Sequence, residues 1–180
     1  EPAVLIGHSM GGLHAWCYAG AHPERVRAVV VEDMAADWVG GSSADWVALM
    51  RTWPVPFPDG AAMLGYFGPV AGEYFRRSFT RGADGYRLHG ELETFQAIAE
   101  DWGTRAFWPE WESVQAPVLL IEAEHTITPP GQMREMAARQ RNCRYARIDG
   151  AGHLAHDDQP ARYRELVSDF LRSLPIGPRG

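Results

Sequence analysis

The sequence predicts an α/β fold with a mostly parallel sheet, because apolar runs of strand length alternate with helical patterns. An apolar run at residues 3–6 is followed by a helical pattern at 13–21 and a second apolar run at 26–31. A strand, a helix and a strand within about thirty residues form a β-α-β unit, in which the two strands are parallel. In such a sheet, ligands bind beyond the carboxyl ends of the strands.

The same alternation returns near the C-terminus. There the pattern predicts a strand at 116–121, a helix at 133–141, a short strand at 144–148 and an amphipathic helix at 159–174. Between 148 and the last helix, residues 149–153 have the glycine-rich composition of a loop. These elements extend the sheet begun at the N-terminus.

The middle of the chain has a different character. From residue 34 to about 114 no strand pattern is visible and aromatic residues are dense, with helical patterns at 43–51, 69–79 and 87–102. We therefore expect a helical cap inserted into the sheet domain. The predicted division is a core segment at 1–37, a cap at 38–114, a second core segment at 115–175 and a tail at 176–180.

The motif Gly-His-Ser-Met-Gly-Gly at residues 7–12 directly follows the first predicted strand. Glycine at 7 and 11 gives the Gly-x-Ser-x-Gly spacing of a nucleophile elbow, a tight strand-to-helix turn that exposes the serine in a strained conformation. The glycines at 7, 11 and 12 leave room for strand and helix to approach. Ser9 is thus the expected nucleophile, and the backbone N–H of Met10 is an expected oxyanion donor.

A serine nucleophile needs a base within hydrogen-bonding reach. His153 is the expected base, because it follows a predicted strand in an exposed Gly-Ala-Gly turn and comes last in the order Ser, acid, His. The alternatives are His125 and His156, which we expect at the surface or behind the catalytic groups. His8 adjoins the nucleophile but should point to the opposite face, since neighbours in an extended segment alternate.

The third catalytic group is an acid that orients the histidine. Asp33 ends the strand next to the nucleophile strand and is the expected acid, whereas Glu32 before it should point to the other face. The loop after residue 121 offers Glu122 and Glu124 instead, and Glu124 is the alternative acid.

Composition and charge exclude several function classes. The 180 residues carry a formal net charge of -6 with 22% charged residues and no basic stripe, so a nucleic acid is not an expected partner. No apolar run reaches the length of a membrane span and no leader is visible, so we expect a cytoplasmic protein that does not bind membranes. The two cysteines have no metal-ligand spacing, and we expect neither a metal nor a cofactor.

The chain resembles the α/β-hydrolase superfamily over essentially its whole length, and three segments carry the resemblance. They are the Gly-His-Ser-Met-Gly-Gly motif, Val-Val-Val-Glu-Asp-Met at 29–34 and Gly-Ala-Gly-His-Leu-Ala-His at 150–156. Many members carry the acid in the loop after the strand at 118–121, which here has no aspartate. A subgroup of esterases and thioesterases of the bacterial YbfF type uses an aspartate after the strand that follows the elbow helix, the place of Asp33.

The resemblance implies a serine hydrolase that cleaves small-molecule carboxylic esters or thioesters through an acyl-enzyme, by a Ser-His-Asp triad. It also implies that the chain corresponds to the C-terminal two-thirds of such a hydrolase. The strands before the elbow would be absent, with the His-Gly loop that contributes a second oxyanion N–H. We expect a dimer partner or an N-terminal segment to cover the exposed sheet edge.

Two further interpretations remain open at the level of sequence. The chain would be a truncated, catalytically inactive hydrolase-like remnant or a binding module if the absent strands are essential. A haloperoxidase-like or acyltransferase activity on the same three residues is not separable from hydrolysis by sequence.

Overall fold

A computed structural model of the protein describes residues 1–40 and 43–175. The chain forms two compact units, one made of residues 1–37 together with the chain from 107 onward, the other of residues 38–106. Among the described residues, the helices are all too short or too polar to cross a membrane.

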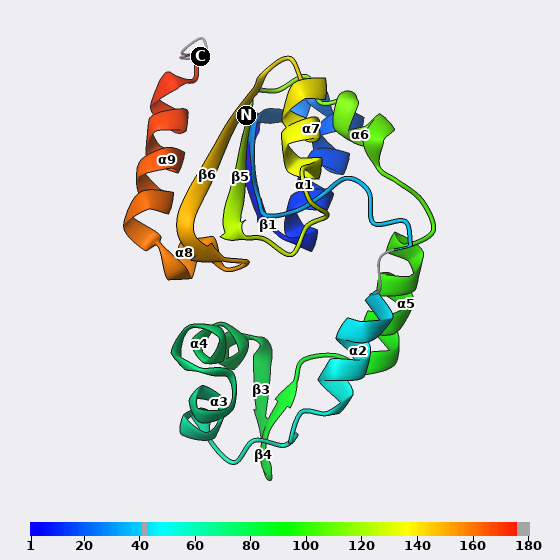
Figure 1. The fold of residues 1–180 in the computed structure, drawn as a ribbon, viewed down its shortest axis with the longest axis vertical. Helices are drawn as coiled ribbons and strands as arrows, with labels where there is room; N and C mark the ends of the chain where they lie inside the picture. The colour runs from blue at the N-terminus through cyan, green and yellow to red at the C-terminus, as the bar shows by residue number, and fades with distance from the viewer. Residues whose placement is uncertain (41–42, 176–180) are drawn as a thin grey trace. The chain divides into compact units, whose positions relative to one another are not determined.

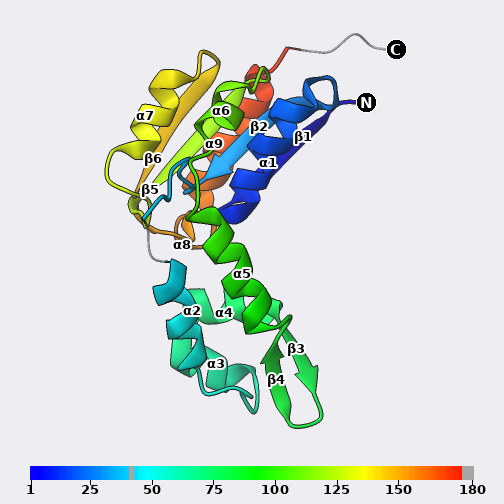
Figure 2. The same ribbon diagram turned by 90° about the vertical axis from the view of Figure 1, so that its right-hand side faces the viewer.

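The first unit is built on a parallel sheet of four strands. Its strands are β1 (Ala3–His8), β2 (Val26–Glu32), β5 (Val118–His125) and β6 (Cys143–Gly152). They lie in the order β1-β2-β5-β6, and each neighbouring pair is parallel (Figure 2). The predicted α/β class is thereby confirmed. β1 lies at one edge of this sheet, where the Ile6 side chain is 54% exposed.

Helices cover both faces of the sheet (Figure 1). One face carries α1 (Met10–Ala21), α6 (Trp108–Glu112) and α7 (Gln132–Arg139); the other carries α8 (Ala155–Asp158) and α9 (Pro160–Ser173). α9 is amphipathic as predicted, and its buried Leu166 and Phe170 pack in one cluster with Leu119 of β5. A short 3-10 turn, Pro23–Arg25, leads from α1 into β2. Because the two central strands, β2 and β5, are covered on both faces, apolar residues follow one another along them rather than alternating.

Strands β5 and β6 are longer than predicted. The glycine-rich residues 149–152, expected as a loop, are the last part of β6. Parallel pairing extends to Ala123 opposite Ile148, and after a register shift His125 lies opposite Gly152. Pairing with a neighbouring strand therefore overrides the loop-forming tendency of the glycines.

The second boundary between the units falls after residue 106, whereas we expected it after 114. The reason is Trp111 of α6, which is fully buried in the first unit with its ring 5.5 Å from that of Trp16 in α1. Its indole N–H donates to the carbonyl of Met136 at 2.8 Å. Gln140 donates to the carbonyls of Trp111 and Val114 and fixes the end of this segment.

The second unit combines helices with a β-hairpin. Its elements are α2 (Ser43–Arg51), α3 (Gly60–Phe67), α4 (Pro69–Ser78), β3 (Phe79–Gly82), β4 (Gly85–Leu88) and α5 (Leu92–Trp102). The expected helices at 43–51 and 69–79 are present. The expectation of a helix from residue 87 and of no strands was wrong, because residues 79–88 form the antiparallel β3–β4 hairpin seen in Figure 2. Helix α3 was not predicted.

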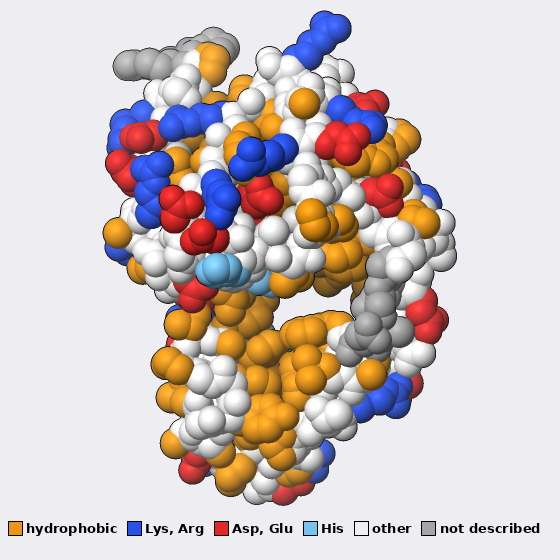
Figure 3. All heavy atoms as spheres, viewed as in Figure 1, with side chains coloured by type: hydrophobic (Ala, Val, Ile, Leu, Met, Phe, Trp, Pro, Cys, Tyr) orange, Lys and Arg blue, Asp and Glu red, His pale blue; other side chains and the backbone are white. Residues whose placement is uncertain are grey.

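Aromatic residues form much of the core of the second unit. The Trp53 ring lies 4.9 Å from that of Phe67 and 5.0 Å from that of Phe75. Around it pack Met50, Phe57, Met63 and Phe79. Apolar side chains also cover much of the second unit's face seen in Figure 3.

Candidate active site

The turn between β1 and α1 has the geometry of a nucleophile elbow. Ser9 has φ 53° and ψ −128°, a left-handed conformation that is rare for residues with a side chain and costs about 1–3 kcal/mol. A Cβ on Gly7 would lie 2.2 Å from the carbonyl oxygen of Gly11, so no side chain fits there. A Cβ on Gly11 would have no neighbouring atom within 4 Å, which corrects the expectation that all three glycines are needed for space.

Backbone hydrogen bonds fix Ser9 against the neighbouring strand. Its N–H donates to the carbonyl of Glu32 at 2.9 Å, and its own carbonyl accepts from Gly12 at 2.8 Å. Serine is a favoured N-cap residue, yet the Ser9 hydroxyl makes no capping hydrogen bond to the described residues of α1. The N–H of Met10 belongs to the first helical turn, where N–H groups have no acceptor within the helix.

Asp33 lies where β2 ends, beside the elbow. His8 and Glu32 are partners in the β1–β2 register, so the residues that follow them, Ser9 and Asp33, leave the same edge of the sheet. Asp33 is fully buried, with φ 48°. Its N–H donates to Ile121 at 2.8 Å and its Oδ1 accepts from the N–H of Ala123 at 3.0 Å.

The structure brings Asp33 and His153 together. Asp33 Oδ2 lies 2.7 Å from Nδ1 of His153, which follows the end of β6 and is 120 residues away in sequence. A hydrogen bond from His153 to an ionised Asp33 carboxylate, which only accepts, requires the proton of the ring to be on Nδ1. In the neutral ring Nε2 is then the nitrogen with the lone pair, as a general base requires.

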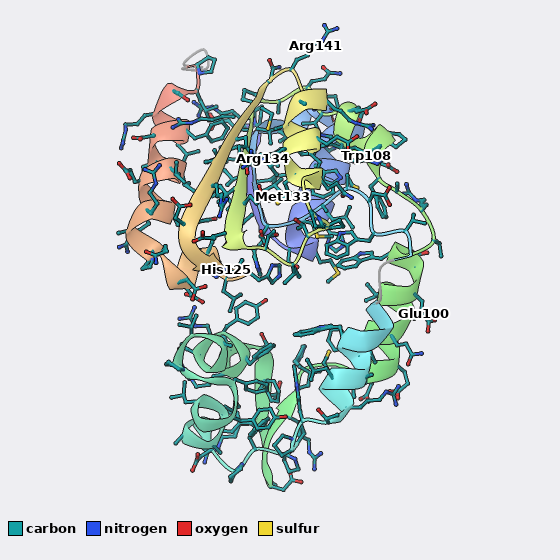
Figure 4. The ribbon with its side chains drawn as sticks, viewed as in Figure 1. Glu100, Trp108, His125, Met133, Arg134 and Arg141 are labelled. Atoms are coloured by element: carbon teal, nitrogen blue, oxygen red, sulfur yellow. The ribbon has the colours of Figure 1, made fainter. Side chains whose placement is uncertain are left out.

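The alternative residues lie elsewhere. The Glu124 carboxylate accepts from the N–H of Gly150 at 2.7 Å and from Arg147 at 2.9 Å, so it joins β5 to β6 rather than bonding to His153. The Gly150 N–H, and less strongly the Arg147 charge, hold the pKa of Glu124 below its ordinary value. His125, labelled in Figure 4, is the exposed last residue of β5.

A second carboxylate–imidazole pair, which the sequence did not predict, lies behind the first. Glu32 is 1% exposed, and its Oε1 accepts from the backbone N–H of His156 at 3.0 Å and lies 2.9 Å from Nδ1 of that ring. The consecutive acids at 32 and 33, matched by histidines three residues apart at 153 and 156, are the sequence signal that could have shown it.

His8 contacts both histidines of these pairs. Its ring centroid lies 4.5 Å from that of His153 and 5.2 Å from that of His156, and its Nε2 lies 2.8 Å from the carbonyl oxygen of His153. Burial, and next the charge of His153, lower the pKa of His8. The His8 side chain thus bonds to the backbone of the histidine segment.

Within residues 1–40 and 43–175, no three His, Cys, Asp or Glu side chains are grouped so that they could hold a metal ion. The titratable groups at the site are instead arranged as carboxylate–imidazole pairs.

Curated proteins and solved structures that are similar to this chain include the following three. The chain is 26% identical over 185 residues to the sn-1-specific diacylglycerol lipase ABHD11 of Mus musculus, covering 94% of this chain and 59% of that protein. It superposes on E-2-(acetamidomethylene)succinate hydrolase with a TM-score of 0.81 at 19% identity, covering 96% of this chain and 67% of the other. It superposes on the enol-lactonase from Burkholderia xenovorans LB400 with a TM-score of 0.69 at 23% identity, covering 96% of this chain and 66% of the other.

These two structural likenesses show the fold. The family evidence is independent of them, because the sequence profile described as the Alpha/beta hydrolase family matches residues 1–166. The match includes the elbow, the end of β2 and the histidine segment. The chain therefore belongs to the alpha/beta hydrolase family.

Proposed function

We propose that this chain carries the catalytic residues of a serine hydrolase that cleaves carboxylic ester or thioester bonds of small molecules. The observation that carries the proposal is the 2.7 Å hydrogen bond between Asp33 and His153 at the sheet edge where Ser9 sits in its strained turn. A buried acid, an imidazole with its proton directed at that acid and a serine in a nucleophile elbow are the parts of an acyl-transfer site.

In the first half-reaction Ser9 Oγ attacks the carbonyl carbon of the substrate while His153 Nε2 takes the hydroxyl proton. The carbonyl electron pair moves to oxygen, and the resulting oxyanion accepts a hydrogen bond from the Met10 N–H. When the tetrahedral intermediate collapses, the bond to the alcohol or thiol breaks and His153 returns its proton to that leaving group. Asp33 holds the imidazole in its tautomer and stabilises the imidazolium that forms.

In the second half-reaction water replaces the leaving group. His153 takes a proton from the water, whose oxygen bonds to the acyl carbon, and returns that proton to Ser9 Oγ as the ester bond to the enzyme breaks. The products are a carboxylic acid and the free enzyme. Every proton is carried by the chain's own groups, so the proposed cycle uses neither a metal nor a cofactor.

Three further observations support ester or thioester chemistry. The Ser9 hydroxyl is not used as a helix cap, so it is available as a nucleophile. The acid follows β2, as in the esterase and thioesterase subgroup that the sequence resembles. The mouse relative, of which this chain spans 59%, bears the name of a lipase.

Hydrolysis of p-nitrophenyl butyrate and of a butyryl thioester by the full-length protein tests the proposal. We expect turnover that Ser9→Ala abolishes and that Ser173→Ala, a serine whose hydroxyl bonds within α9, leaves unchanged. The ratio of the two substrates' kcat/KM separates esterase from thioesterase activity. If neither substrate is turned over by the wild-type protein, a catalytically inactive remnant or binding module becomes the better interpretation.

A further inference from the structure

Glu32 is a buried carboxylate that the proposed reaction does not use. It ends β2 next to Asp33, and the two side chains bind different histidines of one segment, His156 and His153. The bonds of Glu32 to His156 involve both the backbone N–H and the ring. A buried carboxylate without such partners would be costly, so the pair holds α8 at a defined position against β2.

Several polar groups face this pair. His8 lies opposite Glu32 on β1, Asp33 follows Glu32 directly after the end of β2, and His156 lies on α8. Tyr163 of α9 is also influenced by Glu32; burial, and then the negative charge of Glu32, raise the pKa of the Tyr163 hydroxyl. Asp157 of α8 also faces the imidazole, with its Oδ2 3.6 Å from His156 Nε2. The second pair therefore has charged and polar neighbours at the edge of the apolar core that includes Ile121 and Ala155.

His8 joins the second pair to the first. It contacts the rings of both His153 and His156, and it bonds to the backbone carbonyl of His153. The histidine segment is thus held at three points: by Asp33 at the ring of His153, by His8 at its carbonyl, and by Glu32 three residues further on. Only the first of these belongs to the proposed triad.

We propose that Glu32 and His156 form a positioning pair that, together with His8, holds His153 in line between Asp33 and Ser9. This inference rests on the proposed function for its catalytic consequence. The pair acts through the His153 segment and does not touch substrate. A catalytic group displaced by about 1 Å loses up to about 100-fold in rate, so even a small movement of α8 would be measurable.

The test compares Glu32→Gln and His156→Gln with a matched control, Glu122→Gln, in the full-length protein. Glu122 is also a buried glutamate of the sheet, bonded to Tyr145, but it does not hold the histidine segment. We expect the first two variants to lower kcat for p-nitrophenyl butyrate by about 10- to 100-fold with KM within twofold. Glu122→Gln should leave both constants unchanged.

A second readout needs no turnover. The low-field NMR resonance of the His153 Nδ1 proton, assigned with His153→Gln, reports the hydrogen bond to Asp33 and should shift or broaden in Glu32→Gln, because the ring is then less firmly held. The resonance in Glu122→Gln should match the wild type. His156→Gln keeps the Glu32 carboxylate, and it replaces Glu32→Gln in both measurements if Glu32→Gln does not fold.

Two results would overturn the inference. One is a folded Glu32→Gln protein with wild-type kcat and an unchanged resonance of the His153 Nδ1 proton. The other is an equal loss of kcat in Glu122→Gln, which would indicate a general effect of buried glutamates. Absence of turnover or of Ser9 reactivity in the wild type would instead refute the proposed function, while the His153 Nδ1 proton resonance would still decide whether the pair positions that ring.

Discussion

Gly7→Ala should destabilise the protein strongly, whereas Gly11→Ala, in the same motif, should not. A Cβ at residue 7 would lie 2.2 Å from the Gly11 carbonyl oxygen, 2.3 Å from its carbon and 2.5 Å from the nitrogen of Gly12. All three are backbone atoms, so no side-chain rotation can relieve the overlap, and β1 and α1 would have to separate.

The magnitude follows from two opposing terms. Overpacking of this kind costs up to about 3 kcal/mol, while replacing glycine by alanine in regular backbone gains about 0.5–1 kcal/mol. We therefore expect Gly7→Ala to lose about 2 kcal/mol, a fall in Tm of about 4–8 °C for a chain of this size. Gly11 lies in α1 with open space around its Cβ position, and Gly11→Ala should raise Tm by up to about 4 °C.

Thermal unfolding followed by circular dichroism at 222 nm measures both variants against the wild type. The comparison is controlled internally, because both substitutions add one methyl group to the same motif. Wild-type stability of Gly7→Ala, or a loss of stability in Gly11→Ala equal to that in Gly7→Ala, would refute the elbow geometry on which the site is built.

Three further predictions concern the site and the core. Asp33→Asn should lower kcat for p-nitrophenyl butyrate by about 100- to 10,000-fold, while Glu124→Gln stays within twofold; equal losses in steady-state assays would contradict this. The pKa of His8 is lowered in the folded protein, so just below pH 6.5 the His8 imidazole becomes protonated in the unfolded state but not in the folded state. The free energy of unfolding therefore falls on acidification. Urea denaturation between pH 7.5 and 5.5 measures how the free energy of unfolding depends on pH. This dependence should be shallower by up to about 1.4 kcal/mol per pH unit in His8→Gln, and an unchanged dependence would show that His8 does not cause the loss of stability on acidification. Trp111→Ala should lower the free energy of unfolding, measured by chemical denaturation, by about 3–5 kcal/mol. Substitution of the exposed Ile127 by Ala should lower it by less than about 1 kcal/mol, and similar losses in the two variants would place Trp111 outside the core.

Local pattern was sufficient to predict the elements that position Ser9 and Asp33. The motif around Ser9 combines a strand, a turn and a helix within a short stretch, so its conformation follows from neighbouring residues. Asp33 was predicted because a parallel strand next to the elbow strand must end at the same edge of the sheet. Both inferences use only the order and direction of strands.

Elements that depend on distant partners were predicted less well. Gly150 and Gly152 belong to β6 because β5 pairs with that strand, and nothing in their own composition indicates it. The β3–β4 hairpin was missed because each strand has only four residues and β4 runs into a stretch with helical spacing. The Glu32–His156 pair joins residues 124 positions apart, a contact that no local pattern specifies.

The most direct test of the central claim is covalent trapping of Ser9. The full-length protein is treated with a fluorophosphonate, and the labelled peptide is identified by mass spectrometry. We expect one adduct on Ser9, lost in Ser9→Ala and formed at least about tenfold more slowly in Asp33→Asn and His153→Gln, because the hydroxyl then lacks its oriented base. A folded wild-type protein that is not labelled, or is labelled at the same rate without Asp33 and His153, would contradict it.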